Sequence, residues 1–205
     1  MLGEIALYYT EYTSVTHRGI HEHSMRSTER YENVRHIAAQ FFNVKPIEII
    51  YTYGTTHGIN FVSHNLEHTL KKGDKILITL MEHHANILPW QHLEKTKGIT
   101  LEYVNVLKDG TIDMEDFKKQ IPGVKLFATL HVSNVLGTIN PVKKLTELAH
   151  KEGALVLIDG AQSAPHMPVD LEDIGCDFFV CSSHKFTGPT GAGILFVKQE
   201  VMDSL

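Results

Sequence analysis

The stretch ALVLIDGAQSAPHMPVDLEDIGCDFFVCSSHKFTGPTGAGILFV (residues 154–197) holds three short apolar runs, each typical of a buried strand. The runs are Ala154–Ile158, Asp177–Cys181 and Gly193–Val197. The first ends directly in Asp159 and the second in Ser182, so polar groups stand where the strands are expected to end. This stretch predicts part of an α/β sheet with functional groups at its edge.

The same alternation of strands and helices continues towards the N-terminus. Strands are expected at Glu48–Tyr51, Lys75–Thr79, Thr100–Val106 and Val124–Leu130, which brings the number to seven. Helical periodicity predicts helices at Ser27–Phe42, Thr56–Leu70, Ala85–Lys97, Met114–Lys119 and Pro141–Lys151. The core-facing stripes of the first two are expected to be Val34, Ile37, Ala38, Phe41 and Phe42, then Ile59, Val62, Leu66 and Leu70. We expect one domain, a three-layer α/β/α sandwich with a mainly parallel seven-stranded sheet.

Composition excludes several classes of protein. The 205 residues are 42% apolar and carry a formal charge of −5, with no apolar run near the roughly 20 residues that span a bilayer. The first residues lack the order of a signal peptide, so a cytoplasmic location is expected. Without Lys/Arg clusters, neither nucleic acid nor membrane is an expected partner. Cys176 and Cys181 are interpreted as packing thiols in a reducing compartment.

Two strand ends carry groups whose chemistry is open to more than one interpretation. Gly54-Thr55-Thr56 stands at a strand-to-helix turn, where hydroxyls and free N–H groups form either an anion site or an ordinary helix cap. Asp159 follows an apolar strand, so its carboxylate needs a cation such as a protonated ring nitrogen; a helix cap and a metal ligand are the alternatives.

Lys185 follows another strand, in a loop of small residues. A lysine held there can act as a nucleophilic amine towards an aldehyde, although a solvated surface lysine is the alternative. A phosphate cradle, a carboxylate for a ring nitrogen and a Schiff-base lysine on neighbouring strand ends together describe a pyridoxal 5'-phosphate (PLP) site.

Five ordered segments resemble the class V aminotransferase family of PLP enzymes. They are TTHGIN (55–60), MEHHANILPWQ (81–91), SNVLGT (133–138), DGAQSAPHMPVD (159–170) and SSHKFTGPTGAGILF (182–196). Within that family they are most similar to the SufS-type cysteine desulfurases and selenocysteine lyases. The resemblance covers essentially the whole chain and implies the large PLP-binding domain of that fold.

The resemblance also implies a role for individual residues. Lys185 would form the Schiff base and shuttle a proton as a catalytic residue, and Asp159 would pair with the pyridinium nitrogen. His83, also catalytic, would stack on the ring. The remaining cofactor contacts would be Asn134 and Gln162 at the phenolic oxygen, and Thr56, Ser182 and His184 at the phosphate, with Thr55 beside them.

The implied activity is removal of sulfur from L-cysteine, which leaves alanine and an enzyme persulfide for iron–sulfur cluster assembly. L-Selenocysteine is the alternative substrate. Another class V reaction (transaminase, epimerase or kynureninase-like lyase) and a non-catalytic PLP-binding remnant or half-enzyme are alternatives too.

Family members have an opening segment and a C-terminal small domain, which supplies the persulfide cysteine and a carboxylate-binding arginine. Residues 1–205 match neither part, so we expect this chain to be the large domain only and incomplete for desulfuration. The expected partners are a second copy in a homodimer and a sulfur-acceptor protein or a complementary C-terminal half.

Fourteen histidines raise the question of a metal site. The spacings that could place imidazoles on one face are His17, His21 and His23, His64 and His68, and His83 with His84. Since the resemblance already explains His83 and His184, no metal is expected.

Overall fold

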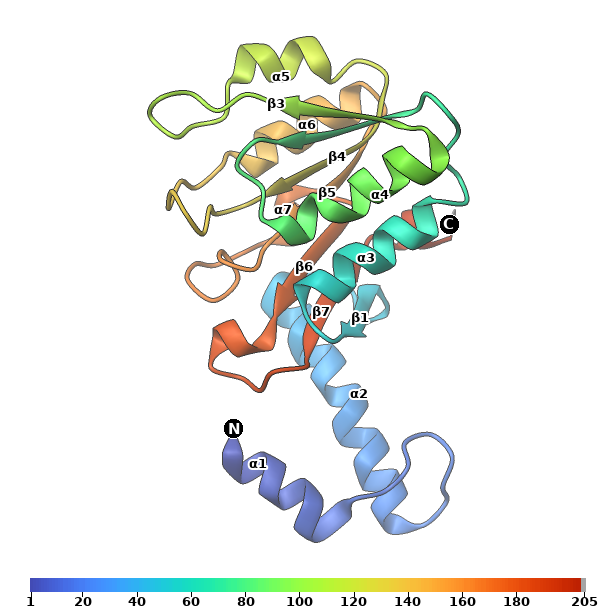
Figure 1. Ribbon diagram of the computed structural model, residues 1–205. Coiled ribbons are helices and arrows are strands. Elements are labelled where there is room, and N and C mark those ends of the chain that lie inside the picture. The colour runs from blue at the N-terminus through green and yellow to red at the C-terminus, as the bar shows by residue number, and fades with distance from the viewer. Residues whose placement is uncertain (204–205) are drawn as a thin grey trace.

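One seven-stranded sheet forms the centre of the computed structural model, which describes residues 1–203 (Figure 1). Its strands are β1 (Ile49–Thr52), β2 (Lys75–Thr79), β3 (Thr100–Val104), β4 (Val124–Leu130), β5 (Leu155–Asp159), β6 (Phe178–Ser182) and β7 (Gly193–Val197). They lie in the order β1-β7-β6-β5-β4-β2-β3, and only the pairings of β7 are antiparallel. The predicted mainly parallel α/β sheet is therefore confirmed.

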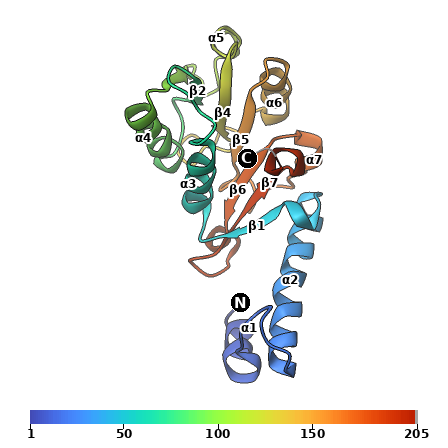
Figure 2. The same cartoon turned by 90° about the vertical axis from the view of Figure 1, so that its right-hand side faces the viewer.

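Helices cover both faces of this sheet (Figure 2). The helices of residues 1–203 are α1 (Leu2–Leu7), α2 (Glu22–Phe42), α3 (Thr55–Leu66), α4 (Leu88–Lys97), α5 (Met114–Gln120), α6 (Val142–Lys151), α7 (Leu171–Ile174) and α8 (Gln199–Met202). Helices α3 and α4 lie on one face, and α5, α6 and α7 lie on the other. A π-helical turn η1 (Tyr8–Tyr12) and the 3-10 turns η2 (Pro46–Glu48), η3 (His84–Asn86) and η4 (Ser183–Phe186) complete the chain. Helices α1, α7 and α8 were not among the predicted elements.

Alternating side chains of the strands supply two separate cores. In β5, Val156 and Ile158 face the core under α5, α6 and α7, whereas Leu157 faces the core under α3 and α4. The predicted stripe of α3, together with Leu70 just beyond it, is buried as expected. Because the sheet buries both faces, its strands are nearly continuous apolar runs.

Three helices differ from their predicted bounds by three residues or more, for local reasons. Helix α2 begins at Glu22, not at the expected Ser27, because the side chain of His21 caps it by accepting from the Ser24 N–H. Pro89 has no N–H to donate, so it suits the first turn of α4, and the preceding residues form the separate turn η3. α3 ends at Leu66, whose carbonyl accepts hydrogen bonds from the N–H and the hydroxyl of Thr69.

The predicted core-facing stripe of α2 is wrong for three of its five residues. Ala38 and Phe42 are buried, but Val34, Ile37 and Phe41 are exposed by 49%, 56% and 54%. The reason is visible in Figures 1 and 2, where α2 reaches the sheet only at its C-terminal end and otherwise runs away from it with α1. Periodicity located an apolar stripe, but no other element of residues 1–203 covers its full length.

The carboxyl ends of all strands except β7 meet at one edge of the sheet. Helix α3 starts at that edge and packs closely on β6. A Cβ at Gly58 would lie 2.7 Å from Val180 Cγ1, so the glycine permits this close approach. This packing places the first turn of α3 beside the ends of β5 and β6.

Candidate functional site

The turn between β1 and α3 gathers hydroxyl and N–H groups. Gly54 adopts φ +136°, a conformation that favours glycine. The Thr55 N–H donates to Ser182 Oγ at 2.8 Å, and the two hydroxyl oxygens lie 2.9 Å apart. Thr56 follows on the exposed side. Because the first N–H groups of a helix attract anions, this corner has the chemistry of a phosphate site.

The carboxyl group of Asp159 is buried at the end of β5, where 4% of the residue is exposed. Its Oδ1 accepts a hydrogen bond of 2.9 Å from the Ala161 N–H. Burial raises the pKa of Asp159, against the smaller lowering effects of this hydrogen bond and of the charges on Lys185 and His83. A cation held against this carboxylate would relieve the unfavourable burial of its charge.

Lys185 lies on η4, directly after β6. The Gly188 N–H donates to the Ser183 carbonyl at 2.9 Å, and the Ser183 N–H donates to the Ala192 carbonyl at 3.0 Å. Thr187 ends the turn with φ +63°. These bonds fold the loop back, and they leave Lys185 half-buried at the sheet edge that holds Asp159.

His83 is the N-cap of η3, and its Nδ1 accepts a hydrogen bond of 3.1 Å from the Ala85 N–H. In the neutral ring the proton is therefore on Nε2. The neighbouring His84 points elsewhere and lines a groove between α3 and α4. Of the two adjacent histidines, only His83 belongs to the sheet edge near Asp159.

The structure brings all nine predicted site residues together around one cavity of about 200 Å³. They are Thr55, Thr56, His83, Asn134, Asp159, Gln162, Ser182, His184 and Lys185. Ala85, Leu130, Val132 and Ala161 supply the rest of the wall. The placement is thus established, whereas the role of each residue stays a prediction.

Sequence reasoning missed one charged residue at this edge. Glu82 is buried behind His83, and its carboxyl group accepts hydrogen bonds from Thr79, Asn86 and the Leu130 N–H. The pKa of Glu82 is raised to about 8, chiefly by burial. The three hydrogen bonds oppose this increase, and repulsion from Asp159 adds to it. The signal was present in the sequence, since Glu82 follows an apolar strand just as Asp159 does.

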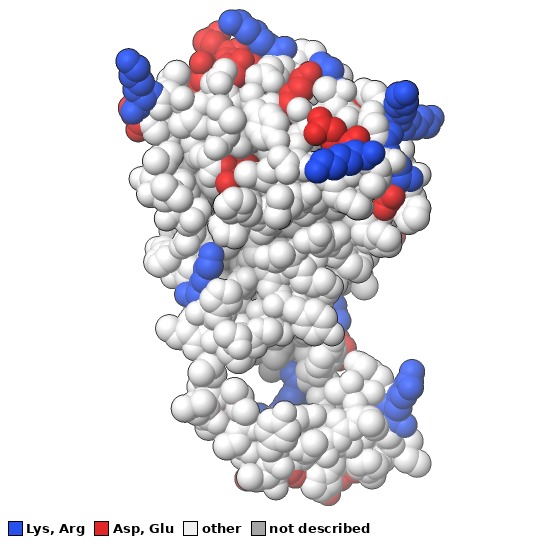
Figure 3. All heavy atoms as spheres, viewed as in Figure 1, with Lys and Arg blue, Asp and Glu red and all other residues white. Residues whose placement is uncertain are grey.

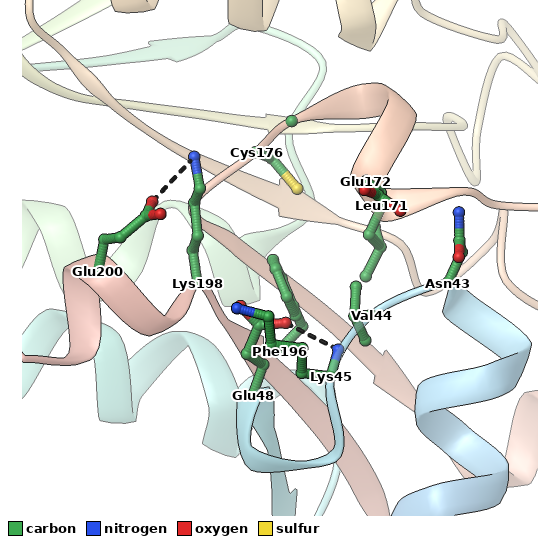
Figure 4. A pocket seen from close by; sticks show the side chains of 11 residues that line it. Asn43, Val44, Lys45, Glu48, Leu171, Glu172, Cys176, Phe196, Lys198 and Glu200 are labelled. Carbon is green, nitrogen blue, oxygen red and sulfur yellow. Dashed lines mark hydrogen bonds and ion pairs between the residues drawn. The ribbon is translucent and has the colours of Figure 1, made fainter.

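A second cavity, of about 430 Å³, lies on another part of the molecule, between the end of α2, α7 and α8 (Figure 4). Three of its charged groups, Glu48, Lys198 and Glu200, have partners within the chain. Glu48 accepts hydrogen bonds from the N–H groups of Lys45 and Gln199 at 2.9 and 3.0 Å, and Lys198 forms an ion pair of 3.3 Å with Glu200. This cavity is larger than the one at the strand ends, but its buried carboxylate, Glu48, is already satisfied.

The histidines considered as metal ligands have other neighbours. His17 lies 3.2 Å from a carboxylate oxygen of Glu32, and His64 lies 3.6 Å from one of Glu67. Within residues 1–203, no three His, Cys, Asp or Glu side chains converge as a metal site would require.

Both cysteines are buried, as predicted, with 1% of Cys176 and 2% of Cys181 exposed. Burial raises the pKa of both thiols, that of Cys181 to about 12. Neither thiol is in a state to act as a nucleophile.

The surface seen in Figure 3 intersperses Lys and Arg with Asp and Glu, mostly at the end of the molecule far from α1. Of the helices formed by residues 1–203, none combines the length and the apolar character needed to cross a membrane.

Comparison with known proteins gives relatives for the whole chain. It is 49% identical over 201 residues to a probable cysteine desulfurase from Halalkalibacterium halodurans and 44% identical over 197 residues to one from Pyrococcus abyssi. These matches cover 97% and 96% of this chain but 50% and 49% of the relatives. The chain therefore spans about half the length of the curated relatives it matches.

A solved structure shows the same fold. The apo structure of a cysteine desulfurase from Thermococcus onnurineus superposes with a TM-score of 0.96 at 41% identity, over 99% of this chain and 51% of that one. The family model for class-V aminotransferases matches residues 1–205. This chain belongs to the class-V aminotransferase family.

Proposed function

We propose that this chain binds PLP in the cavity at the strand ends and forms the cofactor-binding part of a cysteine desulfurase. The family consists of PLP-dependent enzymes. The observation that carries the proposal is the meeting of Lys185, Asp159 and His83 at one cavity, where the two basic groups lie near enough that positive charge on them lowers the pKa of the buried carboxyl. We also propose that these residues belong to the large domain of such an enzyme.

The residues present fit this cofactor. A buried carboxyl group with a raised pKa suits a protonated ring nitrogen, because an ion pair there would offset the burial of the charge. The hydroxyls of Thr55 and Ser182 at the start of α3 suit a phosphate. An amine, an acid and an anion site at separate points of one wall match the three functional ends of PLP.

We assign the cavity residues accordingly. Asp159 would hold the ring nitrogen, and His83 would lie on the ring face. Asn134 and Gln162 would bind the phenolic oxygen. Thr55, Thr56, Ser182 and His184 would hold the phosphate, and Lys185 would supply the amine that joins the aldehyde.

When bound, PLP supplies an electron-withdrawing ring and an aldehyde that condenses with amines. The chain supplies position and charge. Asp159 keeps the proton on the ring nitrogen, since the buried carboxylate stabilises the adjacent cation. Lys185 Nζ moves a proton to and from the substrate α-carbon. His83 offers a proton on Nε2 because Nδ1 is held by the Ala85 N–H.

The proposed substrate is L-cysteine, with L-selenocysteine as the alternative, and the product sulfur would serve iron–sulfur cluster assembly in the cytoplasm. Since Cys176 and Cys181 are buried and protonated, the acceptor would be another thiol, on a sulfur-acceptor protein or a complementary C-terminal half. We further propose that the chain forms a homodimer.

The test is to add PLP to the purified chain and to record its visible absorption. We expect a new band in the wild type that Lys185→Ala abolishes without lowering the melting temperature, because Lys185 is half-buried and serves chemistry. Lys198→Ala, which removes a lysine at the second cavity, is the matched control and should keep the band. A band that persists in Lys185→Ala would contradict the proposal, and so would the absence of any band in the wild type.

A further inference from the structure

The proposed mechanism leaves one buried charged group at the site without a task. Glu82 is 8% exposed and is not among the described residues that line the cavity at the strand ends. Burying a carboxyl group is unfavourable unless hydrogen bonds compensate for the lost water. The partners of Glu82 therefore indicate what its burial achieves.

Both carboxyl oxygens of Glu82 accept hydrogen bonds from buried donors. Oε1 accepts from the Thr79 hydroxyl at 2.5 Å and from the Leu130 N–H at 3.1 Å. Oε2 accepts from Asn86 Nδ2 at 2.7 Å, and Asn86 Oδ1 in turn accepts from Trp90 Nε1 at 3.0 Å. Thr79, Asn86 and Trp90 each have 0% exposure. One side chain thus joins the end of β2, the turn η3, helix α4 and the end of β4.

The bond to Leu130 connects Glu82 with Asp159. Leu130 pairs with Asp159 in the parallel register of β4 and β5, and the next N–H, that of His131, donates to the Asp159 carbonyl at 2.9 Å. A second link acts on the same strand end, since Asn140 Nδ2 donates to the Leu130 carbonyl at 2.9 Å and to Met81 Sδ at 3.3 Å. The segment before His83 is therefore tied to the neighbour of Asp159 on two sides.

The bond to Asn86 connects Glu82 with His83. The Asn86 N–H donates to the His83 carbonyl at 2.7 Å, which closes the turn η3. The same turn presents the Ala85 N–H that holds His83 Nδ1. Because Glu82 anchors Asn86, it fixes the turn that sets the direction of the imidazole.

We propose that Glu82 is a positioning residue, which clamps the segment carrying His83 to the end of β4 and so holds the imidazole at a fixed place relative to Asp159. The proposal rests on the proposed function, since it matters only if His83 lies on the ring of a cofactor that Asp159 binds. Glu82 acts through His83 and does not touch the cofactor.

Glu82→Gln breaks the clamp with a minimal change of shape. The introduced amide still offers one oxygen to Thr79 and Leu130, but its nitrogen faces Asn86 Nδ2, so that two donors oppose each other. At pH 9, where the Glu82 carboxyl is ionised and accepts all three bonds, we expect the affinity of Glu82→Gln for PLP to be about tenfold below that of the wild type, the effect of an unsatisfied buried hydrogen-bonding group.

The double variant Glu82→Gln/Asn86→Asp is the rescue. The amide nitrogen then donates to the new carboxylate, which also accepts from Trp90 Nε1, so every hydrogen bond of the network is restored. We expect its PLP affinity to return to within about threefold of the wild type. Glu94→Gln is the matched control, because its carboxylate also accepts from a strand N–H, that of Leu101, but away from His83.

Two readouts separate positioning from a general structural role. In the first, PLP affinity is measured for Glu82→Gln, His83→Ala and the pair together; if Glu82 acts through His83, the pair binds no worse than His83→Ala alone. In the second, the ring signals of His83 are followed by NMR without cofactor, and we expect Glu82→Gln to shift them and the rescue variant to restore them. Thr79→Val, which removes a single donor to Glu82, gives the same test if Glu82→Gln does not fold.

The proposal is overturned if Glu82→Gln leaves the affinity and the His83 signals unchanged, or if the losses from Glu82→Gln and His83→Ala multiply. A wild-type chain that forms no Lys185-dependent band refutes the proposed function instead. In that case the His83 signals still decide whether Glu82 clamps this segment.

Discussion

The cavity at the strand ends and the second cavity, beside α7 and α8, differ in how Asp159 and Glu48 are satisfied. Around the larger one, Glu48 accepts two backbone N–H groups from within the chain and its neighbours Lys198 and Glu200 pair with each other. Around the smaller one, the raised pKa of Asp159 shows that its hydrogen bond and its cationic neighbours do not compensate for burial. Of these two cavities, volume would favour the second, at about 430 Å³ against about 200 Å³. A carboxylate left short of partners is the better sign of a ligand site.

Glu82, buried next to His83 at the edge of the smaller cavity, predicts a pH dependence of the free energy of unfolding. Burial raises the pKa of Glu82 to about 8 from an ordinary value of 4.5. The folded chain then holds a proton that the unfolded chain releases, so this contribution to stability is complete below pH 4.5 and is lost as the pH rises to about 8. Relative to Glu82→Gln, the wild-type free energy of unfolding should fall by up to about 1.4 kcal/mol per pH unit in this window. Urea unfolding across the window measures it, and parallel curves would refute it.

Asp159→Asn tests whether the carboxylate at the smaller cavity binds the ring nitrogen of PLP. The amide oxygen still accepts from the Ala161 N–H, but the negative charge is lost. We expect PLP affinity to fall by about 10- to 100-fold, the worth of a charged hydrogen bond. The free energy of unfolding should not fall, because the pKa of the buried carboxyl is raised and its ionised form opposes folding. Unchanged affinity would place the ring nitrogen elsewhere.

Glu48→Gln should lower stability and leave PLP affinity unchanged, the opposite of what is expected for Asp159→Asn. The amide can accept from only one side, so the N–H of either Lys45 or Gln199 loses its partner. We expect the chain to lose about 1–3 kcal/mol of stability while its PLP affinity stays the same. Thermal unfolding and absorption titration measure the two quantities, and weaker PLP binding would end the contrast between the cavities.

Glu200→Ala should have the smallest effect. Its ion pair with Lys198 is solvent-exposed, with side-chain exposures of 81% and 39%. Such pairs contribute less than about 1 kcal/mol, so we expect a melting temperature close to that of the wild type and full PLP binding. A large loss of stability would show that this surface contributes more than its pairing suggests.

The sequence predicted the sheet well because the pattern of a doubly covered strand is local. Each run such as Leu155–Asp159 holds its own apolar residues and its own polar end. The gathering of Thr55 and Ser182 also followed from topology, although they are 127 positions apart, because parallel strands share their carboxyl edge.

Two features could not be predicted because they depend on distant parts of the chain. The stripe of α2 at Val34 and Ile37 is apolar, but periodicity does not say whether another element covers it. The role of Glu82 depends on the N–H of Leu130, 48 positions away, and on a registry between β2 and β4 that a strand pattern does not give.

The burial of Cys176 and Cys181 makes these thiols natural probes of local opening of the fold. Cys181 lies in β6, near the centre of the sheet, and Cys176 stands just before that strand. A thiol-specific dye can reach Cys181 only when β6 separates from its neighbours, so the rate at which Cys181 is labelled reports the frequency of that opening. Any molecule that binds the folded chain slows this reaction in proportion to its occupancy, whether or not it absorbs light.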